Sequence, residues 1–209
     1  MTMAAVIQEL AEDPRLIYRH SVNEYHRMIA DGNIEEGAPY ELLDGQIVHK
    51  IRAASGEDPS TVGPRHMTAV TRLGDLDRKF KRFGCHIRLQ GPITLPPYDE
   101  PEPDGAIVIG SSDDYRDRHP KASEVLFAIE VADASIRRDR GYKQRIYANS
   151  GIPIYFIVNL VDGVIEAYNR PMKGKGRYGQ VETLSPKQAV IFIMPAGNIV
   201  KVPVRRLLP

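Results

Sequence analysis

The sequence has few of the residues that crosslink a protein or anchor it in a membrane. Its 209 residues include one cysteine, Cys85, and no tryptophan. A single cysteine excludes an intramolecular disulfide and a cysteine-based metal cluster, which favours a reducing, cytoplasmic location. No apolar run approaches the ~20 residues that a membrane-spanning helix needs. The first residues have neither a basic segment nor a long apolar core, so we expect no secretory signal.

An excess of charge of either sign is also missing. The 28 basic and 27 acidic residues leave a formal net charge of +1. A protein that coats nucleic acid without sequence preference is usually more basic, so any such contact must come from a local patch. Hydrophobic residues make up 42% of the chain, which is enough for a core. We assign residues 1–17 to an N-terminal extension and residues 18–209 to one globular domain.

The spacing of apolar residues predicts helices and strands in alternation. Helices with a glycine at or just beyond their end are expected at residues 21–32, 66–83 and 139–149. Strands are expected at residues 40–51 (a hairpin with an Asp-Gly turn), 86–90 with 93–95 (a strand pair or one bent strand), 106–109, 125–129, 154–158 with 164–168 (a second hairpin), 181–184, 190–193 and 199–204. Loops are expected at residues 52–64, 110–123 and 170–179. This order predicts an α/β (α+β) sandwich, in which helices flank a mixed central sheet and β-hairpins lie at its periphery.

Two of the predicted strands are nearly continuous apolar runs, as expected of central strands that are covered on both faces. One run follows Pro103-Asp104, and the other ends at Glu130. Carboxylates are seldom buried unless they are paired or bind a metal. Glu130 is therefore the stronger candidate, because a Pro-Asp pair before a strand is common by itself.

Two carboxylates near strand ends, followed by a lysine on a helix, suit the hydrolysis of a phosphodiester. A divalent ion neutralises phosphate charge and lowers the pKa of a bound water. Mg²⁺ usually takes only one or two protein carboxylates. We expect Asp104 and Glu130 to hold Mg²⁺ or Mn²⁺ if their strands are neighbours, with the carbonyl of Val131 as a further ligand. Lys143 would then stabilise the negative charge that develops on the phosphate.

Several motifs follow one another in a specific order, although each is short. They are Glu-Leu-Leu-Asp-Gly-Gln-Ile-Val at 41–48, Pro-Arg-His at 64–66, Pro-Asp at 103–104, Glu-Val-Ala-Asp-Ala-Ser at 130–135, Asp-Arg-Gly-Tyr-Lys at 139–143, Tyr-Ala at 147–148 and Gly-Ile-Pro-Ile-Tyr-Phe-Ile-Val-Asn at 151–159. The set resembles the Uma-type putative restriction endonuclease family of the PD-(D/E)xK nuclease superfamily, from Tyr18 to the C-terminus. The resemblance implies the restriction-endonuclease fold, DNA as substrate, and Asp104 and Glu130 as metal ligands.

The resemblance also has departures. The lysine that the superfamily usually keeps two positions after the second acid is replaced by Ala132, and the family pattern implies Lys143 in its place. Ile154 stands where the family usually has an acid, and Phe156 where it usually has tryptophan. These two positions bear on surface detail or oligomer contacts rather than on the metal site.

Other candidates have a functional and a structural interpretation. Glu41 is an additional catalytic acid or a residue of an exposed strand face, and His66 acts at the site or only contacts nearby backbone. The spacing of Asp139, Lys143 and Tyr147 puts them on one helix face. Asp139 also suits a helix N-terminus, and Tyr147 also suits core packing.

Basic residues form three runs, which often are no more than solvated faces. The runs are Arg78, Lys79, Lys81 and Arg82; Arg137, Arg138, Arg140, Lys143 and Arg145; and Lys173, Lys175 and Arg177. The middle run adjoins the predicted site, where the phosphate backbone of a nucleic acid would lie.

Three hypotheses follow. The first is a Mg²⁺-dependent endonuclease that acts on DNA as a homodimer, because cutting both strands of a duplex favours two sites. The second is a non-catalytic module on the same fold that binds nucleic acid or a protein. The third is a structural or regulatory assembly protein whose apolar terminal strands pair between subunits.

Overall fold

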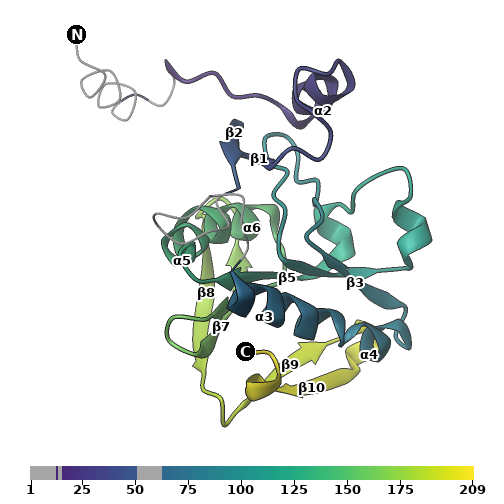
Figure 1. The fold of residues 1–209 in the computed structure, drawn as a ribbon, viewed down its shortest axis with the longest axis vertical. Helices are drawn as coiled ribbons and strands as arrows, with labels where there is room; N and C mark the ends of the chain where they lie inside the picture. Colours follow the sequence, from purple (N-terminus) through teal and green to yellow (C-terminus); the bar gives the residue numbers. More distant parts are fainter. Residues whose placement is uncertain (1–12, 14–15, 51–62) are drawn as a thin grey trace.

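A six-stranded mixed sheet forms the centre of the computed structural model, which describes Asp13, residues 16–50 and residues 63–209 (Figure 1). In spatial order its strands are β3 (Cys85–Leu89), β4 (Gly105–Ile109), β5 (Val125–Ala132), β6 (Ile154–Asn159), β7 (Val164–Met172) and β8 (Arg177–Leu184). Only β5 and β6 run parallel, and the other neighbours are antiparallel. The predicted mixed sheet and its restriction-endonuclease-like fold class are confirmed, whereas the domain boundaries stay a prediction.

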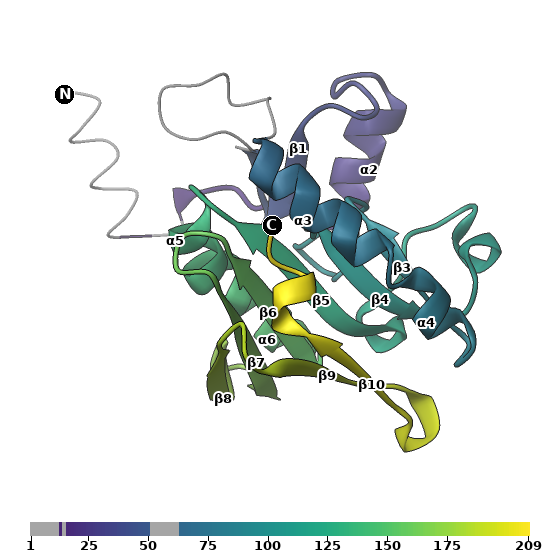
Figure 2. The same cartoon turned by 60° about the horizontal axis from the view of Figure 1, so that its bottom comes forward.

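Helices cover both faces of this sheet, as Figures 1 and 2 show. One face carries α3 (Pro64–Gly74), α4 (Asp77–Lys81) and a C-terminal hairpin of β9 (Ala189–Ile193) and β10 (Ile199–Pro203). The other face carries one continuous helical segment made of α5 (Ile136–Arg138), the π-helical turn η4 (Asp139–Lys143) and α6 (Gln144–Ser150). No helix among the described residues is long and apolar enough to cross a membrane.

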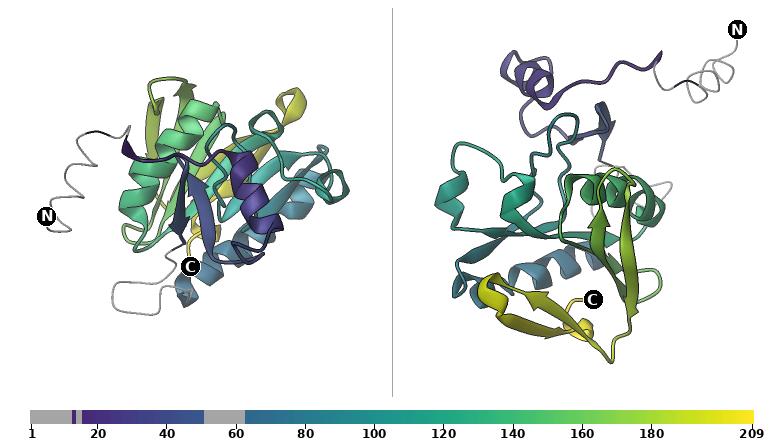
Figure 3. Two further views of the ribbon diagram at one scale, coloured as in Figure 1. Left: turned by 90° about the horizontal axis from the view of Figure 1, so that it is seen from above. Right: turned by 180° about the vertical axis from the view of Figure 1, so that it is seen from behind.

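An N-terminal arm lies beside the central sheet and is seen from above in Figure 3. It consists of α2 (Val22–Ala30) and the antiparallel hairpin of β1 (Tyr40–Leu43) and β2 (Gln46–His49). Ser21 and Glu24 form a capping box at the start of α2. The predicted Asp-Gly turn is confirmed, with φ of 53° at Asp44 and 76° at Gly45. Backbone hydrogen bonds tie the arm to the 97–100 segment, among them Glu100 N to Leu42 O at 2.8 Å.

The pleat of β5 decides which of its side chains face which layer, because successive residues point to opposite faces. Ile129 and Val131 pack with α3 and the C-terminal hairpin. Ala128 and Ala132 pack with α6 on the opposite face. Glu130, which lies between Ile129 and Val131, therefore points toward the helical segment that carries the predicted lysine.

The helix predicted at residues 66–83 is two helices, so that prediction is wrong. The chain bends after Gly74, where an added Cβ would lie 3.0 Å from Cδ1 of Leu89. After the bend, Asp77 accepts a hydrogen bond from the backbone N–H of Ile87 at 3.1 Å. The break thus lets α4 pack along β3, which a straight helix would not do.

Three further predictions need correction. Residues 93–95 form only isolated bridges, Thr94 to Lys121 and Leu95 to Asp99, rather than a strand. The helix predicted at residues 139–149 begins at Ile136. Most of the loop predicted at 170–179 belongs to β7 and β8. The loop predicted at 52–64 and the extension at 1–17 lie largely outside the described residues.

The C-terminal hairpin contributes to stability through Phe192. Its ring packs edge-on against Phe80, Phe127 and Phe156, with centroids 5.2–5.5 Å away. Because the side chain is fully buried, Phe192→Ala should lower the free energy of unfolding by about 3–5 kcal/mol in urea denaturation. The control Ile193→Ala changes a side chain that is 55% exposed and should stay within about 0.5 kcal/mol of the parent. Equal effects of the two substitutions would contradict the packing described.

Candidate active site

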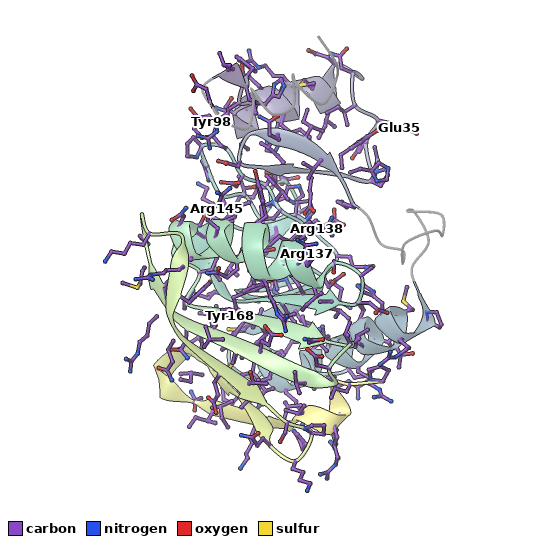
Figure 4. The ribbon with its side chains drawn as sticks, turned by 90° about the vertical axis from the view of Figure 1, so that its left-hand side faces the viewer. Glu35, Tyr98, Arg137, Arg138, Arg145 and Tyr168 are labelled. Carbon is purple, nitrogen blue, oxygen red and sulfur yellow. The ribbon has the colours of Figure 1, made fainter. Side chains whose placement is uncertain are left out.

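Four parts of the chain converge on one small cavity of about 50 Å³ at the C-terminal end of β5. Its lining residues come from β1 and the position after β2, the start of α3, the segment between β3 and β4, and β5 with the following helix: Glu41, Lys50, His66, Gln90, Glu102, Asp104, Glu130, Val131, Asp133, Ala134, Ser135, Arg138 and Lys143. In Figure 4, Arg137 and Arg138 mark the end of the helix next to this region, between the arm and the sheet. The volume suits an ion with a few waters rather than an organic ligand.

Lys143 bridges two buried carboxylates. Its Nζ lies 2.9 Å from Oε1 of Glu130 and 3.2 Å from Oε2 of Glu41. All three residues are at most 4% exposed. The structure thus brings together three of the predicted site residues, and Lys143 reaches Glu130 although Ala132 stands at the usual lysine position.

Tyr147 also holds Glu130. Its hydroxyl donates to Oε1 of Glu130 at 2.7 Å, so Tyr147 and Lys143, one helical turn apart, bind the same carboxylate oxygen. The predicted common helix face is confirmed for these two residues. Tyr147 is fully buried, but it contributes a directional hydrogen bond as well as core packing.

Asp104 is fixed by two donors. Its Oδ2 accepts from the backbone N–H of Val131 at 2.8 Å and lies 3.1 Å from Nε2 of His66. His66 lies on the first turn of α3. Its Nδ1 is buried and has no hydrogen-bond partner among the described residues. The predicted contact of His66 is therefore with a site carboxylate rather than with nearby backbone.

The backbone around Val131 explains why its N–H is free to bind the Asp104 side chain. Gly105 pairs with Ile129 across β4 and β5, so extending this register by two residues puts Pro103 opposite Val131. In an antiparallel ladder the N–H and C=O of one residue point to the same neighbouring strand. Proline has no N–H to give to the Val131 carbonyl, and the Val131 N–H binds the Asp104 side chain instead. Pro103 therefore donates no hydrogen bond to that carbonyl.

Glu41 reaches the site from the N-terminal arm. Its Oε2 accepts from the backbone N–H of Glu102 at 3.1 Å as well as from Lys143. Its Oε1 is buried and has no hydrogen-bond partner within the described part of the chain. The alternative of an exposed strand face is wrong, because Glu41 is 2% exposed.

The π-helical turn sets the position of Lys143. Within it the backbone N–H of Gln144 bonds the carbonyl of Asp139, and the Tyr155 hydroxyl donates to the same carbonyl at 3.2 Å. The Asp139 side chain is buried and accepts from Ser135 Oγ at 2.6 Å. Single π turns in α-helices are frequent at functional sites. Here the widened turn points both Asp139 and Lys143 inward.

Burial and neighbouring charges shift the ionisation of the site. Burial raises the pKa of Glu130 to about 8, although the Lys143 ammonium opposes this. Burial also disfavours the charge of Lys143, but the carboxylates of Glu130 and Glu41 outweigh it and raise its pKa above the ordinary value. The pKa of Asp104 is lowered in spite of burial, because His66 and the Val131 N–H favour its charged form. Lys143 and Asp104 therefore stay ionised at neutral pH.

The ion pair of Lys50 and Glu102, which also lines the cavity, was not among the predicted site residues. A signal was present, since Glu100, Glu102 and Asp104 alternate with prolines. In an extended segment, alternate side chains point to the same side, so this alternation predicts that the three acids lie on one side of the segment.

The middle basic run is only partly available to a substrate. Arg140 binds buried Glu166, with Nη2 2.6 Å from Oε1, and Nη2 of Arg145 lies 3.2 Å from Oδ2 of Asp44. Arg138 lines the cavity, and Arg137 is exposed at the start of the same helix.

The donors at this site fit Mg²⁺ or Mn²⁺. Within residues 16–50 and 63–209, no three His, Cys, Asp or Glu side chains gather into a ready metal-ligand cluster. Mg²⁺ does not require one, since it keeps several waters and uses one or two carboxylates. The carboxylates of Asp104 and Glu130 and the carbonyl of Val131 are all hard oxygen donors, which suit these ions better than zinc.

Comparisons with known proteins agree with this fold. A family model described as "Uma2: Putative restriction endonuclease" matches residues 22–196. The structure is similar to a crystal structure of a putative nuclease belonging to DUF820 from Anabaena variabilis ATCC 29413, with a TM-score of 0.57 and 13% sequence identity, over 80% of this chain and 88% of that chain. At such low identity the likeness shows the fold alone. No curated protein matches the chain.

The raised pKa of Glu130 predicts a dependence of stability on pH. Between the ordinary value of 4.5 and about 8, the folded state holds a proton that the unfolded state has lost. The contribution of Glu130 to stability should therefore fall as pH rises through this window. Urea denaturation at pH 5, 6.5 and 8 should show a flatter dependence for Glu130→Gln than for the parent. The exposed control Glu182→Gln should keep the parental slope, and an unchanged slope in Glu130→Gln would contradict the assignment.

Proposed function

We propose that this chain, which belongs to the Uma2 family of putative restriction endonucleases, is a metal-dependent endonuclease that hydrolyses phosphodiester bonds of DNA. The observation that carries the proposal is the buried pair of Glu130 and Lys143 beside Asp104, at the wall of one cavity. Burying this many charged groups is costly, and a structural role alone would be served as well by apolar residues. Perturbed titratable groups in a cavity are characteristic of functional sites.

Asp104 and Glu130 would hold Mg²⁺ or Mn²⁺, with the Val131 carbonyl as a third oxygen. When bound, the divalent ion neutralises phosphate charge and lowers the pKa of the attacking water. Asp104 is held ionised by His66 and the Val131 N–H, so it is ready to bind a cation at neutral pH. Glu130 has one oxygen, Oε1, fixed by two donors, which leaves Oε2 for the cation.

Lys143 would stabilise the charge that develops on the phosphate in the transition state. Its ammonium is held at the cavity by Glu130 and Glu41, so little reorganisation is needed when a phosphate arrives. Glu41, on the N-terminal arm, also contacts this ammonium and is the candidate additional acid. Arg137 and Arg138 would bind neighbouring phosphates of the DNA backbone.

A duplex has two strands to cut, so we propose a homodimer as the active form. We place it in the cytoplasm, where the buried Cys85 stays reduced.

One observation favours a non-catalytic nucleic-acid- or protein-binding module on the same fold as the second candidate. Lys143 already contacts both Glu130 and Glu41, so these side chains have a partner without any metal. Titration calorimetry with Mg²⁺ or Mn²⁺ separates the two candidates, because only the enzyme requires a bound divalent ion.

The first prediction of the enzyme hypothesis concerns cleavage. Asp104→Asn, Glu130→Gln and Lys143→Met should each lower the rate of Mg²⁺-dependent DNA cleavage by at least about 10²-fold, because each removes charge that acts on the ion or the phosphate. Plasmid, linear duplex, branched and single-stranded substrates should be assayed with Mg²⁺, with Mn²⁺ and with EDTA. The control Glu182→Gln, on exposed β8, should keep parental activity. Full cleavage activity of Glu130→Gln would contradict the proposed metal-dependent mechanism.

The second concerns metal affinity. Tyr147→Phe removes a hydrogen bond to Glu130 without changing the shape of the core, so it should raise the half-saturating Mg²⁺ concentration by about 10–100-fold. The matched control is Tyr178→Phe, which removes a similar buried hydrogen bond, to the Ile152 carbonyl at 2.9 Å. If both variants shift the metal dependence equally, Tyr147 has only a structural role.

A further inference from the structure

A second cavity lies between the strands β6 to β8 and the C-terminal hairpin, and its volume is about 820 Å³. Figures 2 and 3 show the hairpin of β9 and β10 crossing this part of the sheet. The cavity, here called the hairpin groove, shares no lining residue with the catalytic cavity. Its size falls in the range of clefts that bind ligands or peptide segments.

Both faces of the hairpin carry large aliphatic side chains, although Lys201, the cross-strand partner of Ile191, also lies on the outer face. Val190 and Phe192 point into the core. On the other face, Ile191, Ile193 and Ile199 are 41%, 55% and 61% exposed, and Ile193 and Ile199 are cross-strand partners. An antiparallel hairpin with one face in water normally alternates apolar and polar residues. An exposed cluster of this kind marks an interaction site.

The charge around the groove has one predominant sign. Glu182 is the one acidic residue of its lining. Four cationic side chains line it as well: Arg170, Lys187, Lys201 and Arg205. The whole chain carries a net charge of only +1, so this excess is local. The complement of such a surface is both acidic and aliphatic.

We propose that the hairpin groove binds an acidic, aliphatic segment of another protein in extended conformation. Two strands at the groove have an unpaired edge within the described residues, since β8 ends the central sheet and β9 pairs only with β10. An added strand satisfies such an edge through its backbone. Aliphatic side chains then contact Ile191 and Ile193, and carboxylates contact the surrounding cations.

Two other occupants fit less well. A second copy placed on the same groove by two-fold symmetry would bring the four cations against each other, and a head-to-tail contact would not close into a dimer. A nucleic acid matches the charge but not the isoleucines. The aromatic residue of the lining, Phe156, is 4% exposed and offers no stacking surface for a base.

The test is fluorescence anisotropy with a fluorescein-labelled ten-residue peptide of alternating valine and glutamate, titrated with the full chain in EDTA. We expect saturable binding, weakened at least about tenfold by Lys201→Glu and by Ile191→Asp. Ile109→Asp is the matched control, because Ile109 is also 41% exposed but lies on β4, outside the groove. A peptide of alternating valine and lysine should not bind.

Three different outcomes would overturn the proposal, and each can be told apart from the others. Absence of binding, or equal binding by Ile191→Asp and Ile109→Asp, removes the groove as a peptide site. Displacement of the peptide by a single-stranded oligonucleotide assigns the groove to polyanions. A dimer in sedimentation that Ile191→Asp dissociates assigns it to a second copy. Cleavage assays on the same variant keep this result apart from the proposed nuclease function, because the groove and the catalytic cavity have no residue in common.

Discussion

The burial of Glu130 at the end of a central strand is the constraint on which the site depends. A carboxylate removed from water costs several kcal/mol unless a close partner compensates. Lys143 at 2.9 Å and Tyr147 at 2.7 Å supply that compensation from successive turns of one helix. Both donors bind the same oxygen, so the arrangement fixes the direction of the Glu130 side chain. The helix has to lie over this face of the sheet for the strand to be stable.

The remaining charges follow from that pair. Lys143 is itself buried, and Glu41 on the N-terminal arm also contacts its ammonium. Asp104 follows the proline that interrupts the ladder between β4 and β5. Its side chain accepts the hydrogen bond of the Val131 N–H, which the ladder does not use. The site is thus assembled from an arm, a proline-rich segment, a strand and a helix.

The sequence predicted the parts of this arrangement that depend on local pattern. Apolar runs identified β4 and β5, and the order of acids and lysine identified Asp104, Glu130 and Lys143. Features that depend on distant partners were not predictable. The π turn depends on Tyr155, and the pairing that occupies Arg140 depends on Glu166, 26 residues away. The groove under the C-terminal hairpin was missed for the same reason, since only the folded chain brings β9 to β7 and β8.

The central claim is that Glu130 and Asp104 together form the binding site of a divalent ion. A crystal structure of the protein soaked in Mn²⁺, with anomalous data, tests it most directly. We predict one anomalous peak at bonding distance from carboxylate oxygens of Asp104 and Glu130 and from the Val131 carbonyl. A site without a peak at saturating Mn²⁺, with Lys143 still bridging both glutamates, would contradict the account.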